Sequence, residues 1–511
     1  MTAAPIHAVI NLDLPGPTIS RHVYGHFAEH LGRCVYGGFW GGEDSDLPNI
    51  GGIRADVVEA LRAIRIPNLR WPGGCFADEY HWTDGIGPRD QRPRMVNTHW
   101  GNVEENNHFG THEFMALCEL LGADPYVNGN VGSGTVREMS DWVEYLTRDG
   151  DSPMVALRQA NGREQPWRVP FWGIGNEAWG CGGNMRAEAY ADLARRYATF
   201  VRDHGDNRVY RIAAGASDDN YAWTETLMKA ISCLGCSRQP KGPFQALSMH
   251  YYTHNGEGIG RGTATGFTTD EYYRTMMHAR RIHELVRGHA AVMDCYDPHR
   301  HVGLVVDEWG SWWDVEEGTN RAFLFQQNTL RDALVATVHF DVFHTFAGRV
   351  VMSNIAQTVN VLQAVLLTDE RTGALVRTPT YHVYAMNTGH HDARSLAVHL
   401  RDDVPSVQVA NATLSVLSTS ASTRDDNALV SLTNLHAEQA QSVVLDLRGR
   451  EVTGHEARIL TAATLNAHNT VENPDAVSPA PHDGIRPHDR GFLVELPAHA
   501  YVTVHLQLGP S

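Results

Sequence analysis

Short runs of apolar residues alternate with longer amphipathic stretches over most of the chain. Eight of these runs are candidate strands, around residues 24–25, 69–71, 125–128, 171–174, 212–214, 247–249, 304–306 and 350–352. Within the stretch 186–204, Tyr190, Leu193, Tyr197 and Phe200 recur at the spacing of one helix face. Strand-length runs that alternate with helix-period segments predict a mainly parallel sheet.

The residues that follow these runs distinguish between the two folds that use eight parallel strands. Polar or aromatic side chains stand at the end of nearly every run, among them Glu29, Trp71, Asn128, Glu177, His250, Glu308 and Asn354. A barrel enzyme places its chemistry at the C-terminal ends of several strands, whereas an open doubly wound sheet concentrates it at one switch point. We therefore predict an α/β fold with a (β/α)8 TIM barrel over residues 18–379.

The pattern changes after about residue 379. Period-two alternation with turn signals replaces the helical spacing, and Val502, Val504, Leu506 and Leu508 would share one face of a strand. We predict a C-terminal β-sandwich over residues 380–511, in which the segment 473–490, rich in Pro, Asp and His, forms a long loop. Residues 1–17 are too few for a domain, and we expect them to add an edge strand to the sandwich.

Composition and charge exclude several classes of partner. The 511 residues are 42% hydrophobic and 20% charged and carry a formal net charge of −17, which is typical of a soluble globular protein. A negative surface repels phosphate backbones, and no cluster of Lys and Arg stands out, so we expect neither nucleic acid nor membrane as a partner. No segment reaches the roughly 18 apolar residues of a membrane span, and no secretory signal is visible. These features predict a cytoplasmic location.

The cysteines support the same location. Seven cysteines are few for this length and odd in number, unlike the framework of a disulfide-stapled secreted domain. We therefore expect free thiols in a reducing compartment. Cys233 and Cys236 have the spacing of half a zinc site or a redox pair, but no second pair or histidine has matching spacing, so we interpret them as loop cysteines.

Two strand-end carboxylates carry the clearest chemical signal. The run 171–174 leads into Asn176, Glu177 and Trp179, and the run 304–306 leads into Glu308 and further tryptophans. Glycoside hydrolysis needs two such acids, one to protonate the departing oxygen and one to act as base or nucleophile, beside aromatic faces that stack on sugars. The alternative is that each glutamate caps a helix or pairs with an arginine. Such a structural role is common for a single glutamate at a strand end. It is less common for two glutamates that both lie in aromatic surroundings.

Two weaker motifs compete for nearby residues. Gly173, Gly175 and Ala178 satisfy a relaxed dinucleotide fingerprint, but that motif belongs on the first βα turn and the bulky Glu177 would crowd a pyrophosphate. His26 and His30 flank Glu29 in a zinc-binding order that requires a helix, whereas this segment has the pattern of a strand running into a loop. We therefore expect neither a dinucleotide nor a zinc ion at these residues.

Several ordered motifs, spread nearly end to end, are similar to those of a known family. They are Gly25-His26-Phe27-Ala28-Glu29-His30-Leu31-Gly32, Arg70-Trp71-Pro72-Gly73-Gly74, Trp100-Gly101-Asn102 with Asn107-His108-Phe109-Gly110-Thr111, Gly175-Asn176-Glu177, Asp307-Glu308-Trp309, Ala356-Gln357-x-Val359-Asn360, and Asn466-x-His468-Asn469 with Asn473-Pro474. On these residues the chain resembles the α-L-arabinofuranosidases of glycoside hydrolase family 51. The resemblance implies a (β/α)8 barrel with a C-terminal jelly-roll sandwich.

The resemblance also implies roles for individual residues. Glu177 would be the general acid/base at the end of the fourth strand, and Glu308 the nucleophile at the end of the seventh, in a retaining double displacement. Asn176 would bind the sugar 2-hydroxyl, and Tyr252 would orient the nucleophile. The furanose subsite would be lined by Glu29, Arg70, Trp100, His250, Trp312 and Gln357, with Phe27 as part of its wall. Cys75 would also bind the substrate in this subsite; many relatives carry Asn there, and a thiol is a weaker hydrogen-bonding partner than an amide.

The resulting hypothesis is an exo-acting enzyme that removes terminal non-reducing α-L-arabinofuranosyl groups from oligosaccharides of arabinoxylan and arabinan. The resemblance implies a homo-oligomer, hexameric or tetrameric, and no cofactor or metal. One alternative is the same barrel chemistry on another glycoside, such as β-xylan or β-glucan, because loops decide the substrate. Another is a carbohydrate-binding protein without turnover, which would need neither acid. A dinucleotide oxidoreductase is a third.

Overall fold

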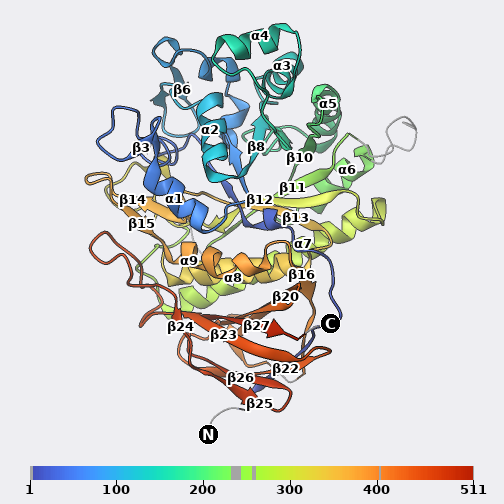
Figure 1. Ribbon diagram of the computed structural model, residues 1–511, viewed down its shortest axis with the longest axis vertical. Helices are drawn as coiled ribbons and strands as arrows, with labels where there is room; N and C mark the ends of the chain where they lie inside the picture. Colours follow the sequence, from blue (N-terminus) through green and yellow to red (C-terminus); the bar gives the residue numbers. More distant parts are fainter. Residues whose placement is uncertain (1–3, 232–242, 256–259, 402–403, 510–511) are drawn as a thin grey trace.

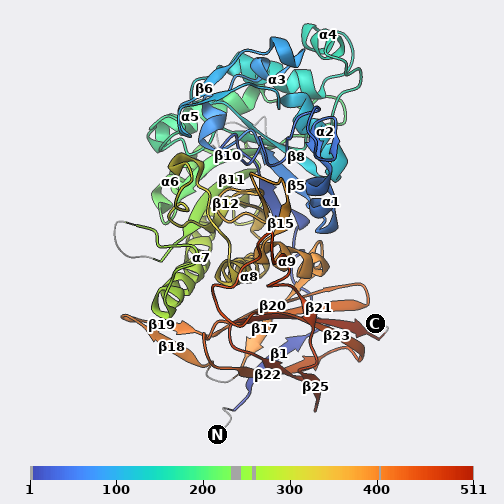
Figure 2. The same ribbon diagram turned by 90° about the vertical axis from the view of Figure 1, so that its left-hand side faces the viewer.

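The computed structural model describes residues 4–231, 243–255, 260–401 and 404–509 of the chain. Figure 1 shows two layered parts, a barrel with its helices above and a pair of sheets below, and places both chain ends beside the sheets. Figure 2 shows α7, α8 and α9 lying between the barrel strands and the sheets. Cys233 and Cys236 lie outside the described residues.

Eight parallel strands form a closed barrel in the order β10-β11-β12-β13-β2-β5-β8-β9. Closure is made by β13 and β2, where Asn354 lies opposite Gly25. Each strand contains or adjoins one of the apolar runs, so the predicted barrel is confirmed. The strands are β2 (Gly25–Phe27), β5 (Asn68–Trp71), β8 (Asp124–Gly129), β9 (Phe171–Ile174), β10 (Tyr210–Ser217), β11 (Ala246–Thr253), β12 (Gly303–Ser311) and β13 (Val350–Ile355).

Helices follow the barrel strands and cover the outside of the barrel (Figure 1). Local sequence signals set several of their ends: the Thr135 side chain caps α3, Thr268 and Glu271 form a capping box at α7, and Gly122 ends α2 in the left-handed conformation. The helices are α1 (Ala55–Ala63), α2 (Thr111–Leu121), α3 (Val136–Thr147), α4 (Pro153–Ala160), α5 (Ala187–Phe200), α6 (Tyr221–Ile231), α7 (Thr269–Tyr296), α8 (Leu330–Thr345) and α9 (Pro379–Met386).

Short elements lie in the loops of both parts of the chain. The 3-10 helices are η1 (Arg21–Tyr24), η2 (Cys75–Asp78), η3 (Trp82–Gly85), η4 (Arg89–Gln91), η5 (Arg321–Phe323) and η6 (Thr388–His390). Four two-stranded ribbons pair β3 (Asn49–Ile50) with β4 (Ile53–Arg54), β6 (Met95–Asn97) with β7 (Val103–Glu105), β14 (Leu366–Thr368) with β15 (Leu375–Arg377), and β18 (Ser406–Val409) with β19 (Ala412–Ser415).

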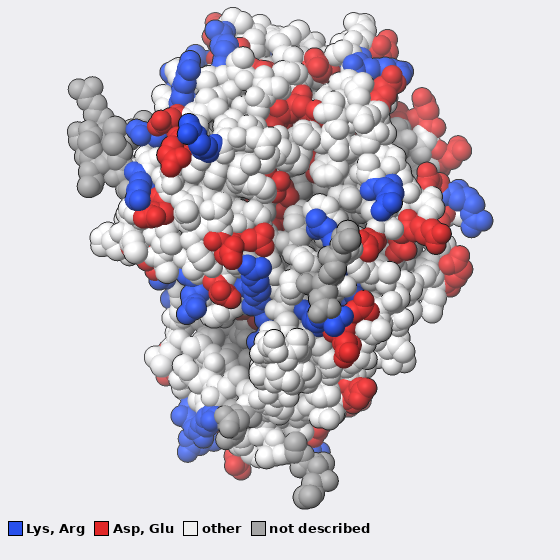
Figure 3. All heavy atoms as spheres, turned by 180° about the vertical axis from the view of Figure 1, so that it is seen from behind, with Lys and Arg blue, Asp and Glu red and all other residues white. Residues whose placement is uncertain are grey.

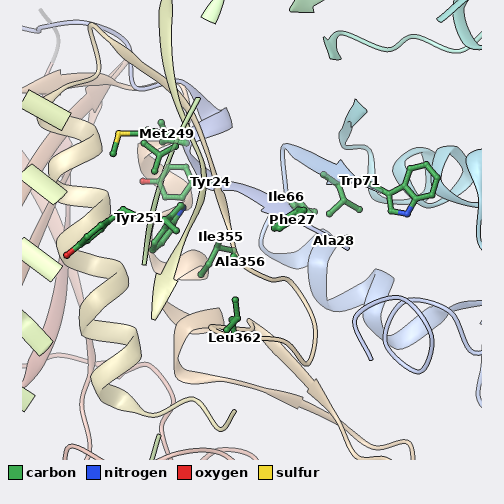
Figure 4. Close-up of a cluster of buried hydrophobic side chains, with 14 of the residues drawn as sticks. Tyr24, Phe27, Ala28, Ile66, Trp71, Met249, Tyr251, Ile355, Ala356 and Leu362 are labelled. Carbon is green, nitrogen blue, oxygen red and sulfur yellow. The ribbon is translucent and has the colours of Figure 1, made fainter. Parts of the chain in front are cut away.

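Apolar side chains of the strands and of the surrounding helices form one large core. Figure 4 shows Tyr24, Met249, Tyr251 and Ile355 within it, beside a helix that packs on the barrel. The buried Trp309 of β12 stacks on His339 of α8, with ring centroids 4.9 Å apart. Because the core holds the strands rigidly, the side chains that leave their C-terminal ends are held in fixed positions.

The C-terminal part contains two sheets, as predicted, with strand orders β17-β1-β22-β26-β25 and β16-β20-β21-β27-β23-β24. Their facing apolar residues form a second core. The strands are β1 (Ile6–Asn11), β16 (Arg394–Leu396), β17 (Val398–Leu400), β20 (Leu417–Arg424), β21 (Asn427–Asn434), β22 (Gln441–Arg448), β23 (Val452–Leu460), β24 (Ala480–Pro481), β25 (Ile485–His488), β26 (Gly491–Leu496) and β27 (Ala500–Leu508).

Three details differ from the sequence predictions. The N-terminal strand β1 lies between β17 and β22 rather than at an edge. The segment predicted as one long loop contains β24 and β25, which lie at sheet edges where one face is solvated and polar residues and Pro487 are tolerated. The boundary predicted at Pro379 falls on the first residue of α9, which packs on α8 and so extends the barrel part. We propose the remaining division, with residues 1–17 joined to the sandwich, as the domain organisation.

Charged side chains are dispersed over the surface. On the face shown in Figure 3, Lys and Arg side chains lie interspersed with Asp and Glu side chains. Among the helices of the described ranges, none is long and apolar enough to cross a membrane.

A buried polar chain joins α8 to the sandwich strand β20. Ser418 and Ser420 each donate a hydrogen bond of 2.6 Å to the carboxylate of Asp341 on α8. The single proton of the Ser420 hydroxyl is thereby used, so His344 Nδ1 donates to Ser420 at 2.9 Å and His344 Nε2 accepts from Tyr24 at 2.6 Å. Burial raises the pKa of Asp341 to about 7, although both serine hydrogen bonds act to lower it.

We expect Ser420→Ala to lower the free energy of unfolding by about 1–3 kcal/mol, because it leaves buried groups on Asp341 and His344 without partners. Because the pKa of Asp341 is raised, ionisation of this carboxyl lowers the free energy of unfolding as the pH rises from about 4 to 7. Removal of the Ser420 hydroxyl takes a hydrogen bond away from the ionised carboxylate and lowers that free energy further. The loss should therefore be larger at pH 8 than at pH 5.

Urea unfolding at both pH values measures this effect, with Thr453→Ala on the exposed side of β23 as the control. An equal loss at both pH values would contradict the assigned role of Asp341.

Candidate active site

The predicted site residues converge at the C-terminal ends of the barrel strands. Arg70 comes from β5, His250 and Tyr252 from β11, and Glu308 from β12. Asn176 and Glu177 follow β9 directly, Glu29 follows β2, and Gln357 follows β13. Strands that are far apart in sequence therefore supply one cluster because the barrel is closed.

Two carboxylates form the centre of this cluster. One oxygen of Glu177, one oxygen of Glu308 and one nitrogen of His250 all lie within 4.8 Å of one another. Glu308 is buried, whereas Glu177 is partly exposed. The buried carboxylate thus lies beside one that solvent and a ligand can reach.

Glu308 is held by two donors. Arg70 Nη1 donates to Glu308 Oε1 at 2.9 Å, and the Tyr252 hydroxyl donates to Oε2 at 2.9 Å. Burial raises the pKa of Glu308, as does the charge of Glu177, whereas the positive charges of His250 and Arg70 act to lower it. Both hydrogen bonds favour the ionised form of Glu308 and fix its orientation.

His250 lies between three carboxylates. Its Nδ1 is 2.8 Å from Glu177 Oε1 and 3.4 Å from Glu308 Oε2, and its Nε2 is 3.0 Å from Asp307 Oδ1. Burial acts to lower the pKa of His250, but the charge of Glu308 and the hydrogen bonds of Asp307 and Glu177 outweigh it and raise the pKa to about 10. The ring is therefore a cation near neutral pH, with both nitrogens as donors.

Asp307 is a site residue that sequence reasoning missed. Besides His250, it accepts a hydrogen bond of 2.7 Å from the Tyr126 hydroxyl and lies 3.6 Å from Arg70 Nε. Side chains alternate in a regular strand, but the register of β12 against both neighbours shifts at this point, which allows Asp307 and Glu308 to contact the same histidine. The sequence signal that could have identified Asp307 is its position next to Glu308 at the end of an apolar run.

Glu29 accepts hydrogen bonds from four groups on three loops. Its Oε1 accepts from Gly74 N, Phe76 N and Trp100 Nε1, each at 3.0 Å, and its Oε2 accepts from Gln357 Nε2 at 3.0 Å. Burial raises the pKa of Glu29 to about 7, with a further contribution from the charge of Glu308, although these donors act to lower it. Glu29 therefore fixes the positions of Trp100 and Gln357, two other predicted subsite residues.

The remaining predicted residues pack around this polar centre. Arg70 Nη2 donates to Asn176 Oδ1 at 2.6 Å, which orients the amide, and the guanidinium lies 4.5 Å from the centre of the Phe27 ring. Trp312 meets Tyr252 edge to face at 4.9 Å. The guanidinium of Arg261 lies over Trp312 at 3.6 Å and is a second contact that the sequence did not indicate.

The turn that carries Glu177 has an unusual backbone. Gly175 has φ +77° and Glu177 has φ +37°, a region that a glutamate rarely adopts and that costs about 1–3 kcal/mol. Asp78 on η2 stabilises the turn, because its Oδ2 accepts from Asn176 N at 2.9 Å. The strain is thus concentrated at the residue that presents the exposed carboxylate.

Known proteins share this architecture along nearly the whole chain. The model of the Alpha-L-arabinofuranosidase 1 domain matches residues 60–270, and that of the Alpha-L-arabinofuranosidase C-terminal domain matches residues 307–500. An intracellular exo-alpha-L-arabinofuranosidase of Bacteroides ovatus is 48% identical over 499 residues, which cover 98% of this chain and 95% of that one. The chain belongs to the α-L-arabinofuranosidases of glycoside hydrolase family 51.

Solved structures agree with this assignment. The family 51 arabinofuranosidase of Xanthomonas axonopodis pv. citri matches with a TM-score of 0.94 and 46% identity, covering 98% of this chain and 100% of the other. An α-L-arabinofuranosidase of Thermotoga maritima in complex with arabinose matches with a TM-score of 0.85 and 30% identity, over 98% and 100% of the two chains. The resemblance found in the sequence motifs is therefore confirmed, as are the fold and the glycoside hydrolase activity.

The cysteines of this family 51 chain depart from the sequence prediction. Cys75 and Cys181 form a disulfide, with Cα atoms 5.5 Å apart, so the expectation of free thiols is wrong for this pair and Cys75 has no thiol to offer a sugar. The two residues are 106 positions apart, and only the barrel places the loop after β5 beside the loop after β9. Cys34, Cys118 and Cys295 are free.

Neither competing motif describes the geometry. Gly173 and Gly175 lie at the end of the fourth barrel strand along the chain, where their turn presents Glu177. His26 packs against the ring of Tyr384, whereas His30 Nε2 accepts from Trp71 Nε1 at 3.1 Å. With Glu29 held by its own four donors, these three residues do not converge on one point.

We expect Asp307→Asn to lower the pKa of His250, because it removes one of the negative charges that keep the ring protonated. The basic limb of the pH dependence of kcat/KM should move down by about 1–3 pH units. Kinetics on an aryl arabinofuranoside between pH 5 and 10 measure this shift.

The matched control is Asp124→Asn. Asp124 is the first residue of β8 and therefore lies at the end of the barrel away from the site. A uniform loss of activity with an unmoved basic limb would mean that Asp307 has only a structural role.

Proposed function

We propose that the chain is a retaining, exo-acting enzyme that removes terminal non-reducing α-L-arabinofuranosyl groups from oligosaccharides of arabinoxylan and arabinan. The observation that carries the mechanism is the approach of Glu177 and Glu308 oxygens to within 4.8 Å. Retaining glycosidases hold their carboxyl groups about 5–5.5 Å apart, whereas inverting enzymes leave about 6.5–9.5 Å for a water molecule. The spacing supports direct attack on the sugar by a carboxylate.

Glu308 is the proposed nucleophile. Its carboxylate is buried and oriented by Arg70 and Tyr252, so one oxygen lone pair can be directed at the anomeric carbon. Attack forms the bond between Glu308 and the anomeric carbon while the bond to the leaving oxygen breaks. When the intermediate is hydrolysed, Glu308 leaves as a carboxylate, and the hydrogen bond from the Tyr252 hydroxyl stabilises its negative charge.

Glu177 is the proposed general acid/base. It is the more exposed of the two acids and therefore the one that a leaving group and then a water molecule can reach. In the first step it donates a proton to the leaving oxygen, and in the second it takes a proton from water.

The furanose subsite is proposed to consist of Glu29, Trp100, Asn176, Trp312, Gln357 and Phe27 around the two acids, with Arg70, His250 and Tyr252 positioning them. We assign no sugar contact to the disulfide-bonded Cys75. The Asn176 amide accepts from Arg70 at its oxygen and donates one N–H to Cys181 Sγ at 3.8 Å, which leaves its second N–H for a sugar hydroxyl. Such bonds strengthen as positive charge develops on the ring.

Exo action and an intracellular location are proposed by extension from the Bacteroides ovatus relative, whose name states both. A homo-oligomer, hexameric or tetrameric, and catalysis without a cofactor are proposed from the family resemblance alone. Cytoplasmic placement would make imported oligosaccharides the substrates, rather than polymers.

We expect Glu308→Ala and Glu177→Ala each to lower kcat on p-nitrophenyl α-L-arabinofuranoside, by about 100- to 10,000-fold for the acid/base and by at least as much for the nucleophile. Azide should restore turnover of Glu177→Ala only, because the small anion can replace the activated water once the intermediate has formed. The exposed Glu59→Ala on α1 is the control. Parallel assays on the β-D-xyloside and β-D-glucoside test the substrate. Faster cleavage of either would overturn the assignment to arabinofuranosides, and binding of arabino-oligosaccharides without cleavage would indicate a carbohydrate-binding protein.

Retention predicts the anomer released first. Proton NMR spectra recorded within the first turnovers should contain the α-arabinofuranose product before mutarotation produces the β form. Initial appearance of the β product would instead require a water molecule between the two carboxylates and would exclude Glu308 as a nucleophile.

A further inference from the structure

The disulfide next to Glu177 has a second possible state. Cys181 Sγ lies 3.6 Å from Glu177 Oε2, and one ligand atom from each of Cys75, Glu177 and Cys181 lies within 4.8 Å of the others. All three residues are partly exposed, so both solvent and small reagents can reach them. Reduction would therefore place two thiols beside a carboxylate.

The two loops are held together independently of the sulfur–sulfur bond. Asp78 lies in the same short helix as Cys75, and its carboxylate accepts from Val131 N at 2.8 Å, Gly132 N at 2.9 Å and Asn176 N at 2.9 Å. Gly180 N also donates to Glu177 O at 2.7 Å, next to Cys181. We expect the cysteine backbones to stay about where they are when the disulfide opens.

The spacing suits a tetrahedral metal ion. With metal–sulfur and metal–oxygen distances of about 2.3 and 2.0 Å, a thiolate and a carboxylate oxygen on one zinc ion lie about 3.5 Å apart, and two thiolates about 3.8 Å apart. The distance from Cys181 Sγ to Glu177 Oε2, 3.6 Å, is already close to the first value. The two sulfur atoms must separate, and the Cys75 sulfur, which starts within 4.8 Å of the carboxylate oxygen, must come to the same distance from it. Rotation of the cysteine side chains allows both changes.

A second triad, Glu177, His250 and Glu308, also lies within 4.8 Å but is a poor metal site. Both nitrogens of His250 are already hydrogen-bonded to carboxylates, Nδ1 to Glu177 and Nε2 to Asp307, so neither offers a lone pair to a metal ion. A soft divalent cation would prefer the two thiolates.

We propose that the reduced protein binds Zn²⁺ through Cys75, Cys181 and Glu177, and that the disulfide abolishes this site. A dithiol reductant gives two electrons and two protons to the disulfide and is itself oxidised to a disulfide, leaving two thiols. Binding of Zn²⁺ then releases both thiol protons as two sulfur–zinc bonds form, and Glu177 supplies an oxygen. Three protein ligands leave the fourth position for water.

The consequence for catalysis rests on the proposed function. A Glu177 carboxylate bound to zinc has lost an oxygen lone pair that proton transfer needs, so zinc should inhibit the reduced enzyme and leave the oxidised enzyme active. The thiols therefore couple the redox state of the compartment and its free zinc to hydrolysis. In a cytosolic protein, disulfides are most often of this transient or sensing kind.

Metal binding is tested directly on two samples of the full-length protein, one oxidised and one reduced with a phosphine. The phosphine is removed from the reduced sample in the absence of oxygen. Equilibrium dialysis should find one more bound Zn²⁺ per chain in the reduced form, and Co²⁺ should give a sulfur-to-metal absorption band in that form only. The extra zinc should be lost in Cys75→Ser and in Cys181→Ser. It should persist in Cys295→Ser and in Cys233→Ser/Cys236→Ser, which removes the other closely spaced pair.

Activity on p-nitrophenyl α-L-arabinofuranoside provides the second readout. We expect stoichiometric zinc to abolish at least nine-tenths of the activity of the reduced enzyme, EDTA to restore it, and the oxidised enzyme to be unaffected. Equal zinc binding in both redox states, or undiminished binding by both single cysteine variants, would overturn the proposal. Because the Co²⁺ band does not require turnover, its presence in a protein that cleaves no arabinofuranoside would disprove the proposed function and not the metal site.

Discussion

The buried guanidinium of Arg70 is the interaction on which the active site depends. It lies on β5, yet it hydrogen-bonds Glu308 on β12 and Asn176 after β9, and it is 1% exposed. A cation removed from water must have its charge and its donors matched, because an unpaired buried charge costs several kcal/mol. The buried guanidinium therefore needs both acceptors beside it, and the same requirement that stabilises Arg70 fixes the positions of Glu308 and Asn176.

The acids of the site differ because their partners differ. Asp307 and Glu308 are adjacent in sequence and both buried. The pKa of Asp307 is lowered, because Arg70, His250 and Tyr126 outweigh the effect of burial, whereas the pKa of Glu308 is raised. Asp307 thus carries a permanent charge that keeps His250 protonated. His250 in turn places a positive charge between Glu177 and Glu308, which lets two acids lie close together. The charge of His250 is therefore as necessary to the pair of acids Glu177 and Glu308 as the charge of Arg70.

The sequence predicted those parts that depend on local pattern. Apolar runs gave all eight barrel strands, and the polar residues after them marked Glu177 and Glu308, because a parallel strand must end where its apolar run ends. Pairings between distant residues were not predictable in this way. The partner of Cys75 lies 106 residues along the chain, and the contact of Asp307 with His250 depends on a shift in strand register. The central position of β1 depends on β17 and β22, whose order in the sheet no local pattern specifies.

Two links of different chemistry hold the turn of Glu177. The backbone of this turn is strained, and the hydrogen bonds of Asp78 to Asn176 and to the loop after β8 restrain it whatever the redox conditions. The disulfide joins side chains rather than backbones, and its sulfur contacts the carboxylate of Glu177. If the disulfide were needed only for stability, a place remote from the acid would serve equally well and expose no functional group to sulfur chemistry. Its position means that reduction changes the surroundings of the acid while the fold of the turn is kept.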